Sequence, residues 1–184
     1  LAPHCQVQTH EAIQSLEMGF LPISGLAGKT GGAYLIPREK EFRLDFLTTV
    51  GRSGETPYEH PDLHVTLQPL RFMEYSLENV QQTVLLSGAD AVIVNLPHPA
   101  RYALHKLIIA GEREGAFQAK TGKDFVQAGL LLSVLRENRP WEVEEAWKNL
   151  DGRGKGWRSR AMRGLQALDR QFPDEGFSAW LAPA

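Results

Sequence analysis

Asp45 is the only carboxylate in the segment Phe42–Thr48, which alternates in the manner of a β-strand. Successive side chains of a strand point to opposite faces, so Asp45 shares a face with Arg43 and lies opposite Phe42 and Leu44. Two interpretations carry equal weight at this point. Asp45 is either an exposed strand residue that pairs with Arg43 or another neighbour, or a metal-ligating carboxylate whose position is fixed by the sheet.

Asp124 has an unusual place in a segment with helical periodicity. At 100° per residue it falls on the same helical face as Ala128, Leu131 and Leu135. An ionised carboxylate that faces a core is costly unless it is paired or hydrogen-bonded. We therefore expect either a buried ion pair with a lysine or arginine, or an orienting residue at the edge of a pocket.

Lys106 lies on its expected helix opposite the apolar stripe that includes Leu104 and Leu107, with Tyr102 and Arg113 nearby. The simpler and favoured interpretation is a solvated helix face. The alternative is a point charge that binds phosphate.

Three further patterns are better explained without a functional site. The loop Gly25–Thr30 resembles a phosphate-binding loop, but Ile23 stands where that motif needs a glycine, and a strand rather than a helix is expected to follow. His60 and His64 have a metal-like spacing, but Pro61 lies between them and no helix places both on one face. The segment 151–170 contains six basic residues, two acids and Trp157, which is more typical of a solvated helix face than of a nucleic-acid footprint.

The elements that position these residues change character near Asn95. We expect a short helix over Thr9–Met18 with Thr9 as its N-cap, and then mainly strands from about Phe20 to Val94, with one short helix over Arg71–Glu78. Helices are expected from Pro99 to the end, over about Pro99–Glu114, Thr121–Asn138, Trp141–Leu150 and Trp157–Phe172. The sequence therefore predicts an α+β protein with a mixed or antiparallel sheet, residues 1–96, followed by a helical bundle, residues 97–184.

Composition excludes several classes of protein. Of the 184 residues, 42% are hydrophobic and 23% are charged, which is typical of a globular protein with a core. The net charge of -2 gives no overall sign of a nucleic-acid or membrane binder. The single cysteine, Cys5, excludes an internal disulfide framework, so we expect a cytoplasmic protein. No apolar run approaches the roughly 18 residues that a membrane helix needs.

Several segments, in one order from Gly19 to Trp147, together resemble a family of bacterial nucleotidyltransferase-like proteins and, more distantly, the abortive-infection nucleotidyltransferase toxins. The segments that carry the resemblance are Gly19–Ile23, Phe42–Arg52, Gln68–Tyr75, Pro97–Leu107 and Ala119–Ala128.

The resemblance implies a site. Enzymes of this fold hold Mg²⁺ on three carboxylates, two from an Asp-x-Asp strand after a Gly-Ser turn and one from a later strand, and Asp45 matches the last of these. Such ions polarise phosphates and activate an attacking hydroxyl. Lys106 matches a lysine that meets phosphate, Lys123 and Asp124 match a polar pair on the next helix, and Arg52 falls in a matching segment. These four residues are the expected nucleotide-binding residues.

The sequence departs from this pattern because it has no Asp-x-Asp and no Gly-Ser before one. The chain begins at Leu1 rather than at a methionine, and we expect the first turn and strand of the fold to lie upstream of it. The expected function is metal-dependent transfer of a nucleotidyl group from a nucleoside triphosphate to a hydroxyl of RNA or protein, with this chain inactive alone. The alternatives are a non-catalytic nucleotide- or RNA-binding module and a toxin–antitoxin-like partner that keeps the fold.

Overall fold

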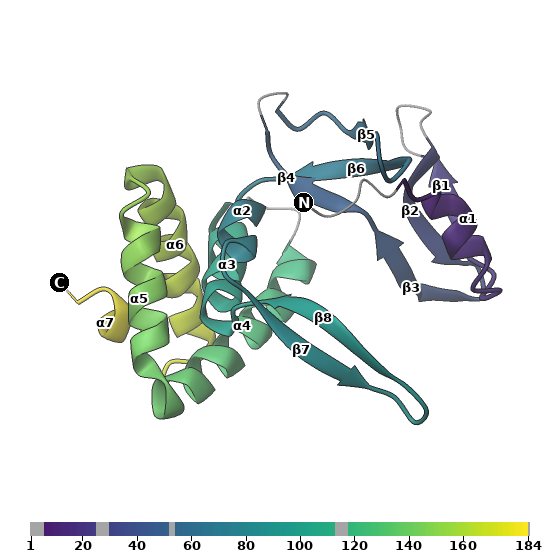
Figure 1. Ribbon diagram of the computed structural model, residues 1–184. Coiled ribbons are helices and arrows are strands. Elements are labelled where there is room, and N and C mark those ends of the chain that lie inside the picture. Colours follow the sequence, from purple (N-terminus) through teal and green to yellow (C-terminus); the bar gives the residue numbers. More distant parts are fainter. Residues whose placement is uncertain (1–5, 25–29, 52–53, 113–117, 184) are drawn as a thin grey trace. The chain divides into compact units, whose positions relative to one another are not determined.

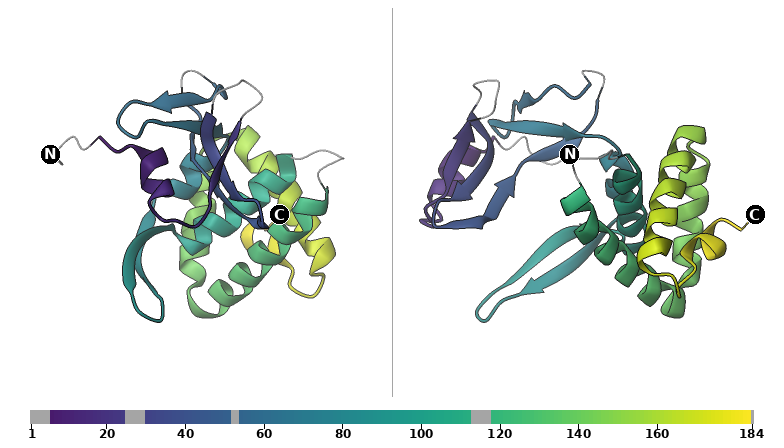
Figure 2. Two further views of the ribbon diagram at one scale, coloured as in Figure 1. Left: turned by 90° about the vertical axis from the view of Figure 1, so that its right-hand side faces the viewer. Right: turned by 180° about the vertical axis from the view of Figure 1, so that it is seen from behind.

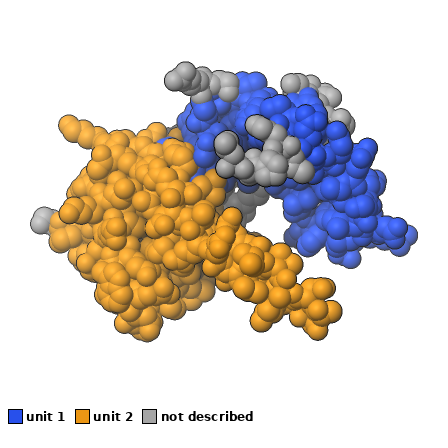
Figure 3. Space-filling model, in the orientation of Figure 1, with its two compact units in different colours: residues 1–73 blue, residues 74–184 orange. Residues whose placement is uncertain are grey.

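The computed structural model describes residues 6–24, 30–51, 54–112 and 118–183, and Figure 1 shows strands in the first half and helices in the second. Strands occupy much of the chain between Leu21 and Pro97, and the described residues from Pro99 onward form five helices. Within the described ranges no strand follows Pro97. The fold is therefore α+β, with antiparallel and mixed sheets, as the sequence predicts. The chain divides into two compact units, Leu1–Met73 and Glu74–Ala184, which Figure 3 shows in different colours.

The first unit begins with helix α1 (Thr9–Gln14) and an antiparallel sheet of β1 (Leu21–Ser24), β2 (Thr30–Ile36) and β3 (Glu39–Asp45), in the order β1-β2-β3. Buried Ile13, Phe20 and Tyr34 form a small core between helix and sheet, and Phe46 packs against it. The sheet thus fixes the backbone of Asp45, which pairs in register with Ala33 of β2.

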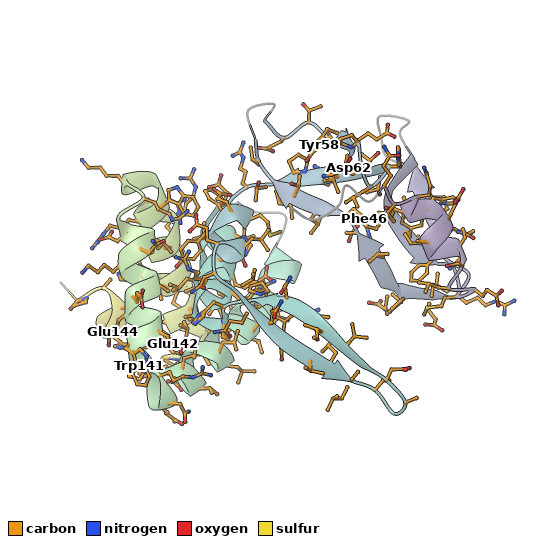
Figure 4. All side chains as sticks on the ribbon, viewed as in Figure 1. Phe46, Tyr58, Asp62, Trp141, Glu142 and Glu144 are labelled. Atoms are coloured by element: carbon orange, nitrogen blue, oxygen red, sulfur yellow. The ribbon has the colours of Figure 1, made fainter. Side chains whose placement is uncertain are left out.

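The expected strand Phe42–Thr48 is in fact two strands that meet at Phe46. The Phe46 N–H donates to Gly32 O at 3.0 Å, whereas Phe46 O accepts from Gln68 N–H at 2.9 Å. The chain therefore changes partners at Phe46 and continues as β4 (Leu47–Thr49). In this second sheet β4 runs parallel to β6 (Val65–Leu70), which also pairs antiparallel with β5 (Tyr58–His60), so the sheet is mixed. Phe46 and Tyr58 are labelled in Figure 4.

The second unit starts within α2 (Met73–Leu77), which leads into a two-stranded hairpin of β7 (Val80–Leu86) and β8 (Ala91–Pro97). The hairpin turns where predicted, and the Ser87 N–H closes the turn on Asp90 O at 2.8 Å. The buried Tyr75 of α2 donates its hydroxyl hydrogen to Ala146 O at 2.7 Å, which attaches α2 to the helices. The compact units therefore divide after Met73, ahead of the hairpin. The expected boundary after residue 96 falls inside the second unit, and as a boundary between domains it stays a prediction.

Four long helices make the body of the second unit: α3 (Pro99–Glu112), α4 (Gln118–Asn138), α5 (Pro140–Asp151) and α6 (Lys155–Gln171). Their bounds agree with the predicted ones to within a few residues. Fully buried aliphatic side chains at helical spacing form the core, among them Leu104, Leu107 and Ile108 of α3 and Leu165 and Leu168 of α6. No helix among the described residues is long and apolar enough to cross a membrane.

Helices α3 and α6 cross at close range through two glycines. A Cβ atom on Gly111 would lie 2.1 Å from Arg160 O, and one on Gly164 would lie 2.2 Å from Leu107 O. Real Cβ atoms do not approach backbone so closely, so both positions require glycine for this packing. This crossing fixes the position of α3, the helix that carries Lys106.

Two details of the predicted helices were wrong. Helix α1 ends at Gln14 rather than at Met18, and Thr9 is its first residue rather than its N-cap. The Thr9 hydroxyl donates to Leu63 O at 2.5 Å, a contact distant in sequence, so it does not cap the helix. A further short helix, α7 (Phe177–Leu181), was not predicted from the sequence.

Candidate functional site

The structure brings Lys106 and Asp124 together on two packed helices. Lys106 of α3 donates from Nζ to Asp124 Oδ1 of α4 at 2.8 Å. The side chain of Lys106 is 22% exposed and that of Asp124 is 11% exposed. Asp124 is thus the buried ion-paired residue that its helical face predicts, and its partner is Lys106. The favoured interpretation of Lys106 as a member of a solvated face is wrong, because its ammonium group is held between two helices.

The surroundings of Lys106 keep its charge in place. Its Nζ also lies 5.1 Å from the centre of the Tyr102 ring, one helical turn earlier. Burial alone would lower the pKa of Lys106, but the hydrogen bond and the charge of Asp124, with a contribution from Tyr102, outweigh burial and raise that pKa above its usual value. The ammonium is therefore fully protonated at neutral pH.

His105 lies beside this pair and is buried within the second unit. Burial, reinforced by the charge of Lys106 and opposed by that of Asp124, lowers the pKa of His105 to about 4. Its buried Nε2 atom has no hydrogen-bond partner among the described residues. His105 is therefore a neutral imidazole at pH 7, and Lys106 is the cation of this cluster.

An ammonium group has three donors, and Asp124 uses at least one of those of Lys106. Because the Lys106 side chain is not fully enclosed, its charge remains within reach of an anion at the surface of α3. A lysine held as a point charge in this way suits a phosphate group. Lys123, one residue before Asp124, is exposed, and adjacent helical residues do not share a face, so it lies apart from the pair.

Asp45 belongs to the other unit and ends strand β3. Arg43 donates from Nε to Asp45 Oδ1 at 2.7 Å, across side chains that are 54% and 38% exposed. This is the pairing that the simpler interpretation of Asp45 predicts, and exposed pairs of this kind contribute little to stability. The hypothesis that Asp45, Lys106 and Asp124 share one site stays a prediction. Arg52, the remaining expected binding residue, lies outside the described residues.

A magnesium site needs several oxygen ligands, and the described residues do not supply one. No group of three or more histidine, cysteine, aspartate or glutamate side chains in ranges 6–24, 30–51, 54–112 and 118–183 is placed to hold a metal ion. Asp45 is the single expected ligand in these ranges, and its carboxylate is engaged by Arg43. The residues present therefore do not fit a complete Mg²⁺ site, and no chemical step is derived through one.

The remaining patterns from the sequence have structural explanations. Strand β2 begins at Thr30, so a strand and not a helix follows the glycine-rich loop, as predicted; residues 25–29 themselves lie outside the described residues. In the basic segment 151–170, Arg153 pairs with Glu78, Arg158 with Asp151, and Arg160 with Glu112. Half of the basic residues of this segment therefore form ion pairs within the chain. This favours a solvated helix face over a nucleic-acid footprint.

Sequence reasoning missed a small polar pocket in the second unit. It is lined by Asn79, His98, Arg101, Glu142, Glu145, Ala146 and Asn149. His98 accepts the Ala100 N–H on Nδ1 at 3.3 Å and directs Nε2 toward Glu142 Oε2 at 3.4 Å; Glu142 is labelled on α5 in Figure 4. The pocket holds about 80 Å³, well below the roughly 300 Å³ of pockets that enclose small organic ligands. A signal for it in the sequence is His98, which stands between Pro97 and Pro99 directly before α3.

A second missed cluster holds α2 against the helices. The guanidinium groups of Arg101 and Arg153 lie 4.8 Å and 5.0 Å from the centre of the buried Tyr75 ring. Both arginines pair with Glu78. Together these residues attach the segment ahead of the hairpin to α3 and to the turn before α6, which is a structural role.

Comparison with known proteins identifies a family and a solved structure to which the chain is similar. A family model described as nucleotidyltransferase matches residues 4–151, most of the chain. A search of the curated proteins gave no match. Among solved structures, the chain is similar to an antigenic nucleotidyltransferase-like protein from Paracoccidioides brasiliensis, with 15% identity and a TM-score of 0.41. That alignment covers 94% of this chain and 65% of the other, so the chain spans less than two thirds of the length of that protein.

Proposed function

The chain belongs to the nucleotidyltransferase family, and from that premise we propose that it takes part in transferring a nucleotidyl group from a nucleoside triphosphate to a hydroxyl of RNA or protein. In such a transfer the acceptor oxygen attacks the α-phosphorus, and pyrophosphate leaves. The observation that carries the proposal is the Lys106–Asp124 pair, which holds the ammonium group of Lys106 in a fixed position on a helix of the matched region.

Lys106 would bind the phosphates of the nucleotide. A triphosphate carries several negative charges, and a fixed ammonium offsets them without having to be reorganised when the nucleotide binds. Asp124 would act as a positioning residue, because it is buried and holds Nζ at 2.8 Å. Arg52 is proposed as a further phosphate contact.

Asp45 would contribute one carboxylate to a Mg²⁺ site that needs further carboxylates from outside the described residues. Asp45 suits this role because β3 fixes its backbone while its side chain stays 38% exposed. Arg43 contacts Oδ1 of Asp45, so the ion would bind Oδ2 or displace Arg43.

One observation favours the alternative of a non-catalytic nucleotide- or RNA-binding module. The carboxylate of Asp45 is engaged by Arg43, and no set of three ligands stands among the described residues. A binding module would need the charge of Lys106 but not the carboxylate of Asp45. Nucleotide binding that is sensitive to Lys106, with no transfer by the intact protein, would identify that alternative.

The test is equilibrium binding of a fluorescent nucleoside triphosphate to the intact protein and its variants. Lys106→Ala should weaken binding about tenfold or more, equivalent to about 1.4 kcal/mol. Lys148→Ala, at an exposed lysine of α5, is the matched control and should bind as the wild type does. Because Lys106→Ala removes the lysine partner of a buried carboxylate, Lys106→Met/Asp124→Leu is measured beside it, and both variants are checked by thermal melting. Wild-type affinity in a folded double variant would refute the role of Lys106.

A further inference from the structure

Helix α4 has a second apolar face that the fold of the chain does not use. Its inner face buries Ala128, Leu132 and Leu135 against the other helices. On the outside, Val126, Leu130 and Val134 are 41%, 60% and 59% exposed. Residues four apart lie above one another on a helix, so these three side chains form one continuous stripe. The solvent side of a helix in a globular protein is normally polar.

Charges of opposite sign lie at the two ends of this stripe. Lys123 and Glu137 are both exposed, and each lies seven residues from Leu130. At 100° per residue, Lys123, Val126, Leu130, Val134 and Glu137 fall within an arc of about 80°. The stripe is therefore a single face with an apolar centre, a positive end and a negative end.

This arrangement is symmetric about Leu130. If two copies of α4 pack antiparallel on a two-fold axis at Leu130, Val126 of one copy faces Val134 of the other, because each lies about 6 Å from Leu130 along the helix. In the same register Lys123 of one copy faces Glu137 of the other, at both ends. Contacts that repeat reciprocally in this way are the property of a two-fold interface between identical chains.

We propose that the outer face of α4 is a self-association surface, on which a second copy of this chain docks antiparallel with Leu130 on the two-fold axis. The charges select this occupant, because the face is complementary to itself. One pair of helices makes a small interface, so the dimer is weak and depends on protein concentration.

The β7–β8 hairpin offers a comparison within the same unit. It extends away from the helices in every view (Figures 1 and 2), and its apolar residues are also exposed, with Leu86 at 80%. Its single charged residue is Asp90 in the turn, so it has no pair of opposite charges that would fix a register. Leu86 is therefore a suitable position for a control substitution.

The first experiment is sedimentation velocity of the intact chain over roughly 1 µM to 1 mM, the range where weak dimers dissociate. The wild type should show a concentration-dependent shift toward a dimer. Leu130→Asp should stay monomeric over the whole range, because it places two carboxylates at the axis. Leu86→Asp should dimerise like the wild type. A monomeric wild type, or a Leu130→Asp variant that dimerises equally well, would overturn the proposal.

Charge reversal tests the register. Lys123→Glu alone places a carboxylate of one copy opposite Glu137 of the other, and should weaken the dimer about tenfold or more. Glu137→Lys alone should do the same, because two ammonium groups then face each other at each end. The combined variant Lys123→Glu/Glu137→Lys restores opposite charges at both ends and should recover the wild-type dissociation constant. Failure of the combined variant to recover would contradict the antiparallel register.

Oxidative cross-linking tests the axis directly. In a Cys5→Ser background, Leu130→Cys should form a disulfide-linked dimer under mild oxidation, because the two thiols meet on the two-fold axis. Glu144→Cys, at an exposed position of α5 labelled in Figure 4, should give little linked dimer under the same conditions. Equal cross-linking at both positions would show random collision and overturn the assignment of the axis.

Discussion

At the scale of single residues, the second unit depends on a charge pair that is nearly enclosed. Asp124→Ala removes the carboxylate and leaves the Lys106 ammonium, whose side chain is 22% exposed, without its partner. Breaking a fully buried pair costs about 3–5 kcal/mol, and the partial exposure of Lys106 reduces this to about 2 kcal/mol. Urea unfolding should show this loss.

The matched comparison for that prediction is Lys106→Met/Asp124→Leu, which removes both charges. Replacing a buried pair with apolar side chains is often close to neutral, so this variant should unfold within about 1 kcal/mol of the wild type. If Asp124→Ala is as stable as the wild type, the pair does not stabilise the fold.

His105 makes stability depend on pH. Its native pKa of about 4 lies below the ordinary value of 6.5, because burial disfavours the imidazolium. As pH falls from 6.5 toward 4, the unfolded chain therefore takes up a proton at this position and the native chain does not. The free energy of unfolding should decrease by about 3 kcal/mol over that window.

The measurement is urea unfolding at a series of pH values between 7 and 4. His105→Leu should flatten the profile in this window, because the variant has no imidazole at this position to take up the proton. Equal slopes for the wild type and His105→Leu would show that His105 is not the titrating group.

At the scale of elements, the crossing of α3 and α6 is set by Gly164. Its Cβ, if present, would overlap Leu107 O, so Gly164→Ala forces two helix backbones apart. Overpacking of this kind costs about 1–3 kcal/mol. Among the described residues, no atom beyond the chain neighbours and own helical backbone of Gly122 in α4 lies within 4 Å of its ideal Cβ. Gly122→Ala should therefore stabilise the protein by up to about 1 kcal/mol. Thermal melts of the two variants that shift in the same direction would contradict this account.

The order of strands and helices could be predicted because local patterns dominate there. The apolar spacing of α3, α4, α5 and α6 repeats over several turns, and Pro99 and Pro140 mark the starts of α3 and α5. Contacts between distant segments could not be predicted in this way. The strand that changes partners at Phe46, and the Thr9 hydroxyl that binds Leu63 O, depend on tertiary contacts that periodicity does not contain. Helix α7 was missed because five residues are too few to show a period.

The site could be predicted in part, because helical periodicity shows on which face of its helix a residue lies. The helical face of Asp124 indicated a buried ion pair, and the structure supplies Lys106 as its partner. Lys106 was assigned to a solvated face because it lies opposite the apolar stripe of its own helix that includes Leu104 and Leu107. Its burial comes from α4, a different helix, so the sequence of α3 alone could not reveal it.

At the scale of the whole molecule, the second unit has its own core. Leu104, Leu132 and Leu165 are fully buried within it, and α2 is attached by the Tyr75 hydroxyl. We therefore expect a fragment of residues 74–184 to fold alone and to melt in one cooperative transition. Circular dichroism of the isolated fragment is the measurement. A helical signal that is lost gradually on heating, without a transition, would show that the unit needs the rest of the chain.

The most direct test of a nucleotidyl-transfer function is a labelling experiment with nucleoside triphosphate that carries its label on the α-phosphate. It is carried out on the full-length protein, because residues 1–184 alone are expected to be inactive. The wild type should transfer label to an RNA or protein acceptor in the presence of Mg²⁺. Asp45→Asn should transfer none, yet melt at the wild-type temperature, because Asp45 is a surface residue 38% exposed. Glu59→Gln, at an exposed carboxylate of the same unit, should retain transfer. Full transfer by Asp45→Asn, or no transfer by the wild type with any acceptor, would contradict the account.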